Sequence, residues 1–245
     1  MGAIDRVIEV AEAEIGYREK KSNADLDSRT ANAGSGNYTK FNRDLKAWTG
    51  VGSLNAQWCQ AFVDWCFIKA FGVDGAKKAL YTFTNYTPTG SGAFRNHGRY
   101  FRRGAGTPQR GDVIYFYSAS KGRIGHVGLV YKAASGKVYT IEGNASDGVN
   151  RKSYALTSTY IDGYGRPDYA ALEGGAPEIE KPCVEITGSV NVRRGPSKAY
   201  GSMGVLHSGD KAHYFGYAHP DNGWLLIEFL NQTGWVSNKY AKVEG

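Results

Sequence analysis

Residues 58–71 have the sequence WCQAFVDWCFIKAF, which is interrupted by polar side chains only at Gln60, Asp64 and Lys69. A helix of this composition is apolar almost all the way round, so it is predicted to lie in the centre of a fold and not on its surface. The same helix carries two cysteines, one at its start and one two turns later. The stretch therefore predicts part of the core and also contains a candidate for chemistry.

The segments on either side of this helix differ in their periodicity. Residues 1–20 place apolar side chains at helical spacing, and a short helix is predicted near residues 38–48. Three later segments are short, rich in β-branched and aromatic residues and separated by turns, as in an antiparallel meander: residues 112–117, 126–131 and 137–142. Helices followed by strands predict an α+β domain over residues 1–171.

The rest of the chain predicts a linker and a second domain. Residues 172–182 hold two glycines, two prolines and three acidic side chains, a composition typical of a linker. Residues 183–245 show only short strand patterns separated by Gly and Asn turns. This pattern predicts a small β-barrel.

The charge of the chain is uneven. The 245 residues include 30 basic and 23 acidic side chains; residues 1–173 hold 23 basic and 16 acidic ones, and residues 174–245 hold seven of each. The basic part is predicted to be attracted to a polyanion such as nucleic acid, anionic lipid or a bacterial wall polymer. No apolar run approaches the roughly 18 residues that a membrane span needs, and three cysteines do not make a disulfide scaffold.

Cys59 and His126 are the candidates for nucleophilic catalysis. A cysteine in the first turn of a helix faces unpaired N–H groups and a partial positive charge, which stabilise a thiolate, whereas Cys66, two turns later, is expected to be core. Of the five histidines, His126 lies in a strand between two glycines, which allow another segment to come close. A hydrogen-bonded structural histidine is the alternative.

A catalytic histidine also needs a group that fixes its orientation. The strand expected to pair with that of His126 ends in Glu142-Gly143-Asn144, and the spacing of two predicts that both polar side chains share one face. Either Glu142 or Asn144 could then reach the imidazole. The alternative is a strand that simply ends in a Gly-Asn turn.

Residues 1–170 resemble the CHAP domain, the cysteine- and histidine-dependent amidohydrolase/peptidase domain of peptidoglycan hydrolases. The matching motifs, in the order of the family, are WCQAFV (58–63), PQRGDVI (108–114), GHVG (125–128), IEGN (141–144) and GYGRP (163–167). The resemblance implies a papain-like fold, with Cys59 as nucleophile, His126 as general base, and Glu142 and Asn144 as the polar third and fourth members. We also expect Trp58, beside the nucleophile, to contact substrate.

Residues 184–245 resemble a bacterial SH3 (SH3-like) domain, a module that binds cell wall. The matching motifs are VNVRRGP (190–196), GWL (223–225) and GWV (234–236), although Trp224 and Trp235 are expected to lie in the barrel core. This domain order resembles a bacteriophage endolysin of Gram-positive hosts. Residues 1–20 lack the apolar segment of a secretion signal, so we expect synthesis in the host cytoplasm and action on the wall after release.

The resemblance implies a peptidoglycan hydrolase that cleaves an amide bond and causes lysis, either an N-acetylmuramoyl-L-alanine amidase or an endopeptidase. A bacterial cell-separation hydrolase and a non-catalytic wall-binding protein that keeps the fold are the alternatives. The expected partners are peptidoglycan and anionic wall polymers, with no nucleic acid and no membrane span, and the expected state is a monomer.

Two further features leave alternatives open. No organic cofactor or zinc site is expected, but some CHAP domains bind calcium, for which Asp25 and Asp27 are the candidates here. A run of basic residues also contains two aromatic ones, Tyr100 and Phe101, which is compatible with nucleic-acid binding, a solvated loop or attraction to an anionic wall. Its members are Arg95, His97, Arg99, Arg102, Arg103 and Arg110.

Overall fold

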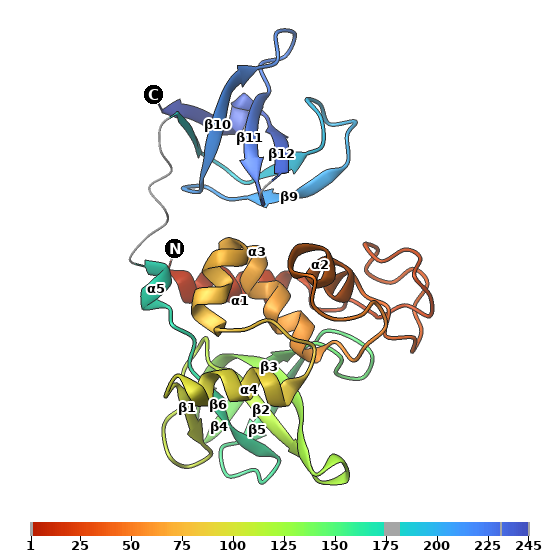
Figure 1. Cartoon of the computed structure of the whole chain (residues 1–245), viewed down its shortest axis with the longest axis vertical. Helices are drawn as coiled ribbons and strands as arrows, with labels where there is room; N and C mark the ends of the chain where they lie inside the picture. The colour runs from red at the N-terminus through yellow and green to blue at the C-terminus, as the bar shows by residue number, and fades with distance from the viewer. Residues whose placement is uncertain (1, 174–181, 231, 245) are drawn as a thin grey trace. The chain divides into compact units, whose positions relative to one another are not determined.

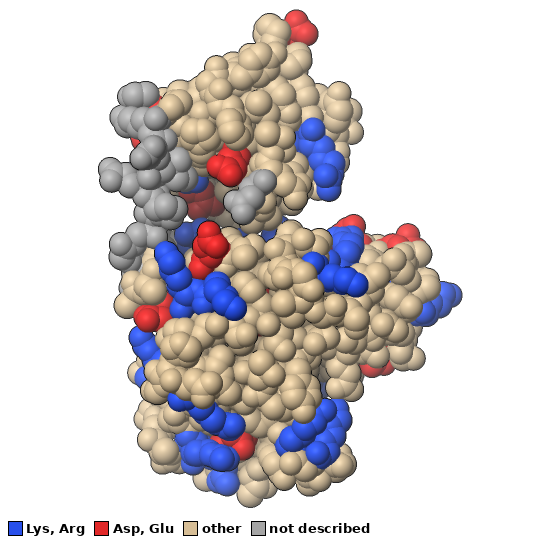
Figure 2. Space-filling model, viewed as in Figure 1, with Lys and Arg blue, Asp and Glu red and all other residues tan. Residues whose placement is uncertain are grey.

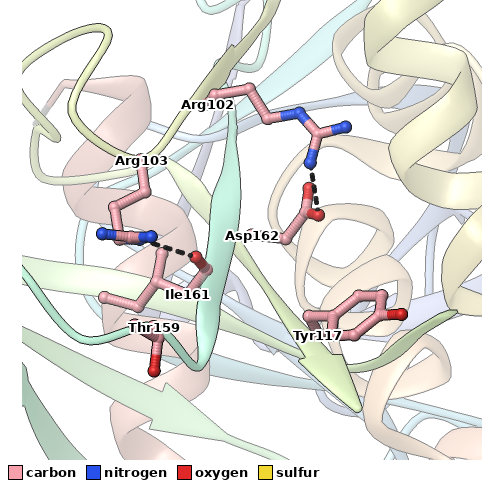
Figure 3. Close-up of a pocket in the computed structure, with 6 residues that line it drawn as sticks. All are labelled: Arg102, Arg103, Tyr117, Thr159, Ile161 and Asp162. Carbon is pink, nitrogen blue, oxygen red and sulfur yellow. Dashed lines mark hydrogen bonds and ion pairs between the residues drawn. The ribbon is translucent and has the colours of Figure 1, made fainter. Parts of the chain in front are cut away.

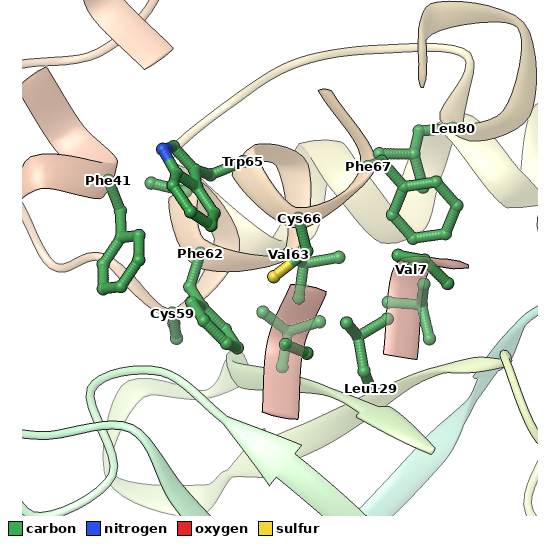
Figure 4. Close-up of a cluster of buried hydrophobic side chains, with 14 of the residues drawn as sticks. Val7, Phe41, Cys59, Phe62, Val63, Trp65, Cys66, Phe67, Leu80 and Leu129 are labelled. Carbon is green, nitrogen blue, oxygen red and sulfur yellow. The ribbon is translucent and has the colours of Figure 1, made fainter. Parts of the chain in front are cut away.

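The apolar stretch at residues 58–71 begins the central helix of the first structural unit. In the computed structural model this helix, α3, spans Cys59–Leu80, and every residue from 59 to 68 is buried. Gly72 interrupts the helical backbone with a φ of 70°, which glycine adopts without strain. Figure 4 shows the side chains of α3 packed against Val7 and Leu129, so α3 joins the N-terminal helix to the sheet.

The structure describes residues 2–173, 182–230 and 232–244 (Figure 1). The chain divides into two compact units, Met1–Gly174 and Gly175–Gly245, and each has a hydrophobic core of its own. Most of the predicted linker lies outside the described residues. Its first two residues, 172 and 173, instead belong to the short helix α5, Ala170–Glu173.

Three further helices surround α3: α1 (Ala3–Ala13), α2 (Lys40–Thr49) and α4 (Thr87–Asn96). The first is shorter than the helical pattern of residues 1–20 predicts, because the chain turns at Gly16, where φ is 87°. The sequence did not predict α4, since its ten residues include a proline and two glycines. It forms through tertiary packing of a buried face that includes Thr87, Ser91 and Phe94.

The sheet of the first unit has six antiparallel strands in the order β1-β6-β2-β3-β4-β5. The three predicted strands are β2 (Val113–Ser118), β3 (Arg123–Ala134) and β4 (Lys137–Glu142). The remaining strands are β1 (Tyr100–Arg102), β5 (Asn150–Ala155) and β6 (Ile161–Gly165). Helices packed on this antiparallel sheet confirm the predicted α+β class.

The second unit is the predicted small β structure. Its seven strands are ordered β13-β7-β10-β11-β12-β8-β9. They span β7 (Cys183–Ile186), β8 (Val190–Arg193), β9 (Ser202–Leu206), β10 (Lys211–Ala218), β11 (Leu225–Phe229), β12 (Gln232–Val236) and β13 (Ala241–Glu244). Trp224 is buried, as expected. Trp235 is only half-buried, and its ring contacts Tyr217 and His219.

Candidate functional site

Cys59 is the first residue of α3, and only 4% of its surface is exposed. The residue before it, Trp58, occupies the N-cap position, but its side chain makes no capping hydrogen bond to the helix. The first intrahelical bond of this turn runs from the N–H of Phe62 to the carbonyl of Trp58 at 2.8 Å. The thiol therefore lies at the positive end of the helix dipole, beside N–H groups that no N-cap side chain satisfies.

Two glycines make room for the groups around this cysteine. A Cβ atom at Gly143, directly after β4, would lie 2.5 Å from Cβ of Phe62, and one at Gly128 in β3 would lie 2.5 Å from Cγ of Glu142. Real Cβ contacts are never this short, so both positions exclude side chains. The absence of a side chain at Gly143 makes room for the first turn of α3, and its absence at Gly128 makes room for the Glu142 carboxylate.

His126 joins the nucleophile to the acid. Its Nε2 lies 2.8 Å from Oε2 of Glu142, and the ring also hydrogen bonds with Cys59. Because Nε2 is engaged by the carboxylate, Nδ1 is the nitrogen left for the thiol. Burial alone would lower the pKa of His126, but the hydrogen bonds to Cys59 and Glu142 and the charges of both groups raise it to about 10. The imidazole is therefore protonated at neutral pH.

Glu142 is itself fixed by two hydroxyl groups. Its side chain is 1% exposed, Thr140 donates a hydrogen bond to Oε1, and Tyr154 donates one of 3.2 Å to Oε2. Oε2 therefore accepts from both Tyr154 and His126. A buried carboxylate with three donors holds one orientation, which fixes the imidazole plane.

Asn144 does not contact the imidazole. The strand ends at Glu142, and Asn144 lies in the following turn with a φ of 56°, so the alternation of strand side chains does not continue to it. Its amide donates a 3.2 Å hydrogen bond to Oδ1 of Asn37. The expectation that Glu142 and Asn144 share one face is wrong, and the carboxylate is the group that meets His126.

Trp58 belongs to the core and not to a substrate surface. The side chain has no exposed surface, its ring stacks on Phe41, and its Nε1 donates a 2.7 Å hydrogen bond to Oε2 of Glu19. A group with no accessible surface cannot contact substrate in this structure, so that expectation is corrected. Cys66 is fully buried as expected, and burial raises the pKa of its thiol.

Aromatic side chains that the sequence analysis did not identify surround His126. The Phe116 ring stacks on the imidazole at 5.6 Å, and Tyr160 stacks on Phe116 at 4.7 Å. Tyr154 packs on Phe116 at 4.8 Å while its hydroxyl bonds Glu142. These contacts depend on the pairing of β4 with β5 and on the loop after β5, neither of which the sequence pattern indicated.

One of the two aspartates considered for calcium is bound to an arginine. The carboxylate of Asp27 makes two hydrogen bonds to the guanidinium of Arg43, of 2.7 and 2.8 Å. Within residues 2–173, 182–230 and 232–244, no cluster of three or more His, Cys, Asp or Glu side chains could hold a metal ion. No step of the chemistry is assigned to calcium.

Comparison with known proteins identifies both domains. Residues 50–144 match the CHAP domain family, and residues 188–242 match the bacterial SH3 domain family. Each unit of the chain therefore contains a segment similar to one of these families. CHAP domains are cysteine- and histidine-dependent amidase or peptidase domains, and the matched segment includes Cys59, His126 and Glu142.

No curated protein matches the chain, but solved structures do. They include "The crystal structure of Ly7917" (15% identity, TM-score 0.40) and "The crystal structure of Ly7917 with the hydrolyzing product of MDP" (14%, 0.41), each covering 98% of this chain and 97% of the other. NlpC2 from Trichomonas vaginalis matches at 9% identity and a TM-score of 0.23, over 56% of this chain and 46% of its own. Because these TM-scores are below 0.5, no inference rests on them.

One further finding concerns membranes. In the part of the chain that the structure describes, none of the helices has both the length and the apolar character needed to cross a bilayer.

Proposed function

We propose that the first unit hydrolyses an amide bond of bacterial peptidoglycan, in the stem peptide or at its junction with muramic acid. The observation that carries this proposal is the chain of contacts from Cys59 at a helix N-terminus, through His126, to the buried Glu142 carboxylate. Nucleophile, proton carrier and orienting group are the three parts that acyl transfer by a cysteine requires.

In the first half of the reaction, the Cys59 thiolate attacks the carbonyl carbon of the amide. The imidazolium of His126 stabilises the thiolate and then gives its proton to the leaving amine, which departs as the C–N bond breaks. Glu142 keeps the ring aligned through this transfer. The backbone N–H of Cys59 and another donor in the first turn of α3 bind the oxyanion of the tetrahedral intermediate.

In the second half, water resolves the thioester. Neutral His126 takes a proton from the water, whose oxygen attacks the thioester carbon. The C–S bond breaks, the carboxylic acid product leaves, and the thiolate–imidazolium pair is restored. This cycle uses only groups of the chain and requires no cofactor.

We further propose that the chain acts as an endolysin. Catalytic domain first and wall-binding domain second is the order expected of such an enzyme, and the bacterial SH3 domain supports cell-wall binding. On this proposal the protein is made in the host cytoplasm, acts on the wall after release and causes lysis. The functional unit is a monomer.

Mass spectrometry of purified walls digested by the full-length protein tests this proposal and identifies the bond. A new amine on the first alanine of the stem peptide would define an amidase, and a new amine within the peptide or its cross-bridge an endopeptidase. Binding without a new amine would instead indicate a non-catalytic wall-binding protein. Amine release without lysis of intact cells exposed from outside would favour a cell-separation hydrolase.

A further inference from the structure

The structure divides the basic run of residues 95–110 into two kinds of arginine. Arg99 pairs with Asp168 at 2.9 Å, and Arg110 pairs with Asp5 at 3.2 Å. The face of the first unit shown in Figure 2 correspondingly has basic groups in separate places, some of them next to acidic ones, and no continuous basic surface. The electrostatic attraction of this basic run to a polyanion is therefore weaker than its sequence suggests, because an arginine paired with an aspartate adds little net charge at a distance.

Two other arginines of the run, Arg102 and Arg103, line a cavity of about 280 Å³ on the β1–β6–β2 edge of the sheet (Figure 3). We call this cavity the Arg103 pocket. It is lined by Arg102, Arg103, Tyr117, Thr159, Ile161 and Asp162.

The charges around the Arg103 pocket do not balance. Asp162, the one carboxylate in the lining, is bonded to Arg95 at 3.0 Å and to Arg102 at 2.7 Å, and also accepts from the hydroxyl of Tyr100. Arg103 has no carboxylate partner among the described residues. Two guanidinium groups thus share one carboxylate and that of Arg103 has none, which leaves an excess of positive charge.

Arg103 is also held in place. Its Nε donates to the carbonyl of Ile161 and its Nη1 to that of Thr157, both at 3.3 Å. Backbone carbonyls fix the orientation of a guanidinium but do not neutralise its charge. A fixed arginine fork without a counter-charge is well suited to bind a carboxylate or a phosphate. Tyr117 and Thr159 line the same cavity.

The Arg103 pocket is connected to the candidate catalytic site through β2. Tyr117 directly follows Phe116, whose ring stacks on His126, and the N–H of Tyr117 donates a 2.9 Å hydrogen bond to the carbonyl of Tyr160. The cavity and the ring that stacks on His126 are therefore contributed by neighbouring residues of β2.

We propose that the Arg103 pocket binds an anionic group of the wall polymer whose amide bond is cleaved, a carboxylate of the peptide or a phosphate of an attached polymer. This proposal rests on the proposed function for the identity of the ligand. It assigns to Arg103 and Arg102 a role in holding substrate and not in the chemical step.

Binding of full-length protein to purified walls tests the pocket without relying on hydrolysis, if all variants carry Cys59→Ala. We expect Arg103→Gln to weaken wall binding roughly threefold and the double change with Arg102→Gln roughly tenfold, as for exposed or half-exposed charge-assisted bonds. Arg103→Lys should retain more binding than Arg103→Gln. Arg110→Gln is the matched control, because it removes the same charge outside the pocket.

Modified walls identify the source of the anion. If the effect of Arg103→Gln vanishes on walls extracted to remove phosphate polymers, the ligand is a phosphate; if it vanishes on walls with amidated carboxyl groups, the ligand is a peptide carboxylate.

In protein that retains Cys59, Arg103→Gln should raise KM and leave kcat nearly unchanged. Equal effects of Arg103→Gln and Arg110→Gln, or no effect of either, would overturn the pocket, whereas failure of the wild type to release an amine would overturn the proposed function.

Discussion

His126 and Glu142 face each other from the adjacent strands β3 and β4, with Nε2 of the imidazole 2.8 Å from Oε2 of the carboxylate. The contact leaves Nδ1 for Cys59, at the N-terminus of α3. It combines a buried acid with a half-buried base, and Thr140 and Tyr154 complete the hydrogen bonding of the acid. The orientation of the histidine therefore depends on three neighbouring strands and not on β3 alone.

The charge of Glu142 should set the upper pH limit of activity. Hydrogen bonding and charge from Cys59 and Glu142 outweigh burial and raise the pKa of His126 to about 10, so the imidazolium persists up to that pH. Glu142→Gln keeps the size but removes the charge, so the pKa should fall. We expect the alkaline limb of the rate–pH profile for wall digestion to move to lower pH, and turnover at neutral pH to drop about tenfold or more.

Asn144→Ala is the matched control for this change, because Asn144 bonds Asn37 and not the imidazole. Its rate–pH profile should keep the alkaline limb of the wild type. If Glu142→Gln leaves that limb in place as well, the carboxylate does not control the protonation of His126.

The Tyr154 hydroxyl should act on turnover through Glu142. Tyr154→Phe removes the 3.2 Å bond to Oε2 while keeping the ring packed on Phe116. We expect kcat to fall several-fold with little change in KM, and stability to fall by about 1 kcal/mol, as for one lost hydrogen bond. Tyr139→Phe in β4 serves as control. An unchanged kcat in folded Tyr154→Phe would show that the hydroxyl does not position the acid.

Stability should also depend on pH through His126. Its pKa is about 6.5 unfolded and about 10 folded, so the folded state binds the proton more tightly. The resulting stabilisation is complete below pH 6.5 and is lost as the pH rises through about 10. Urea unfolding across this range should show a smaller loss for Glu142→Gln than for the wild type. If the free energy of unfolding falls by the same amount in both proteins, Glu142 does not contribute to the raised pKa of His126.

Salt should separate the contributions of the two domains to lysis. Residues 1–173 carry 23 basic and 16 acidic groups, whereas residues 174–245 carry seven of each. Attraction between exposed charges is screened over about 8–10 Å at physiological ionic strength, and an uncharged mode of binding is not. We expect the lysis rate of fragment 1–173 to fall steeply with sodium chloride and that of the full-length protein to fall less, because the second domain tethers it.

Two results would contradict this expectation. Equal salt slopes for the two proteins would show that the second domain provides no salt-resistant binding. A folded fragment that is inert at every salt concentration would show that its positive charge does not suffice for targeting.

Local patterns were enough to predict much of the fold and the central contacts of the site. The apolar helix beginning at Cys59 and the strands of His126 and Glu142 each have clear periodicity, and their glycine neighbours indicated close approach. Trp58 was misassigned because its hydrogen-bond partner, Glu19, is 39 residues away in the chain. Asn144 was misplaced because the backbone turns left-handed after β4.

Long-range pairing explains what the sequence did not predict. The role of Tyr154 depends on the register between β4 and β5, which places Tyr154 opposite Val138. The basic run contains no acid, yet Arg95 and Arg102 share Asp162, which lies about 60 residues further along the chain. Only the three-dimensional structure therefore distinguishes the arginines that pair with an aspartate from Arg103, which does not.

The most direct test of the central claim is amine release from purified walls by full-length protein carrying Cys59→Ala or Cys66→Ala. Cys59 lies at the start of α3 beside His126, whereas Cys66 is fully buried two turns later in the same helix. Mass spectrometry should detect no new amine with folded Cys59→Ala, and the wild-type product with folded Cys66→Ala. Wild-type amine release by folded Cys59→Ala would contradict the account.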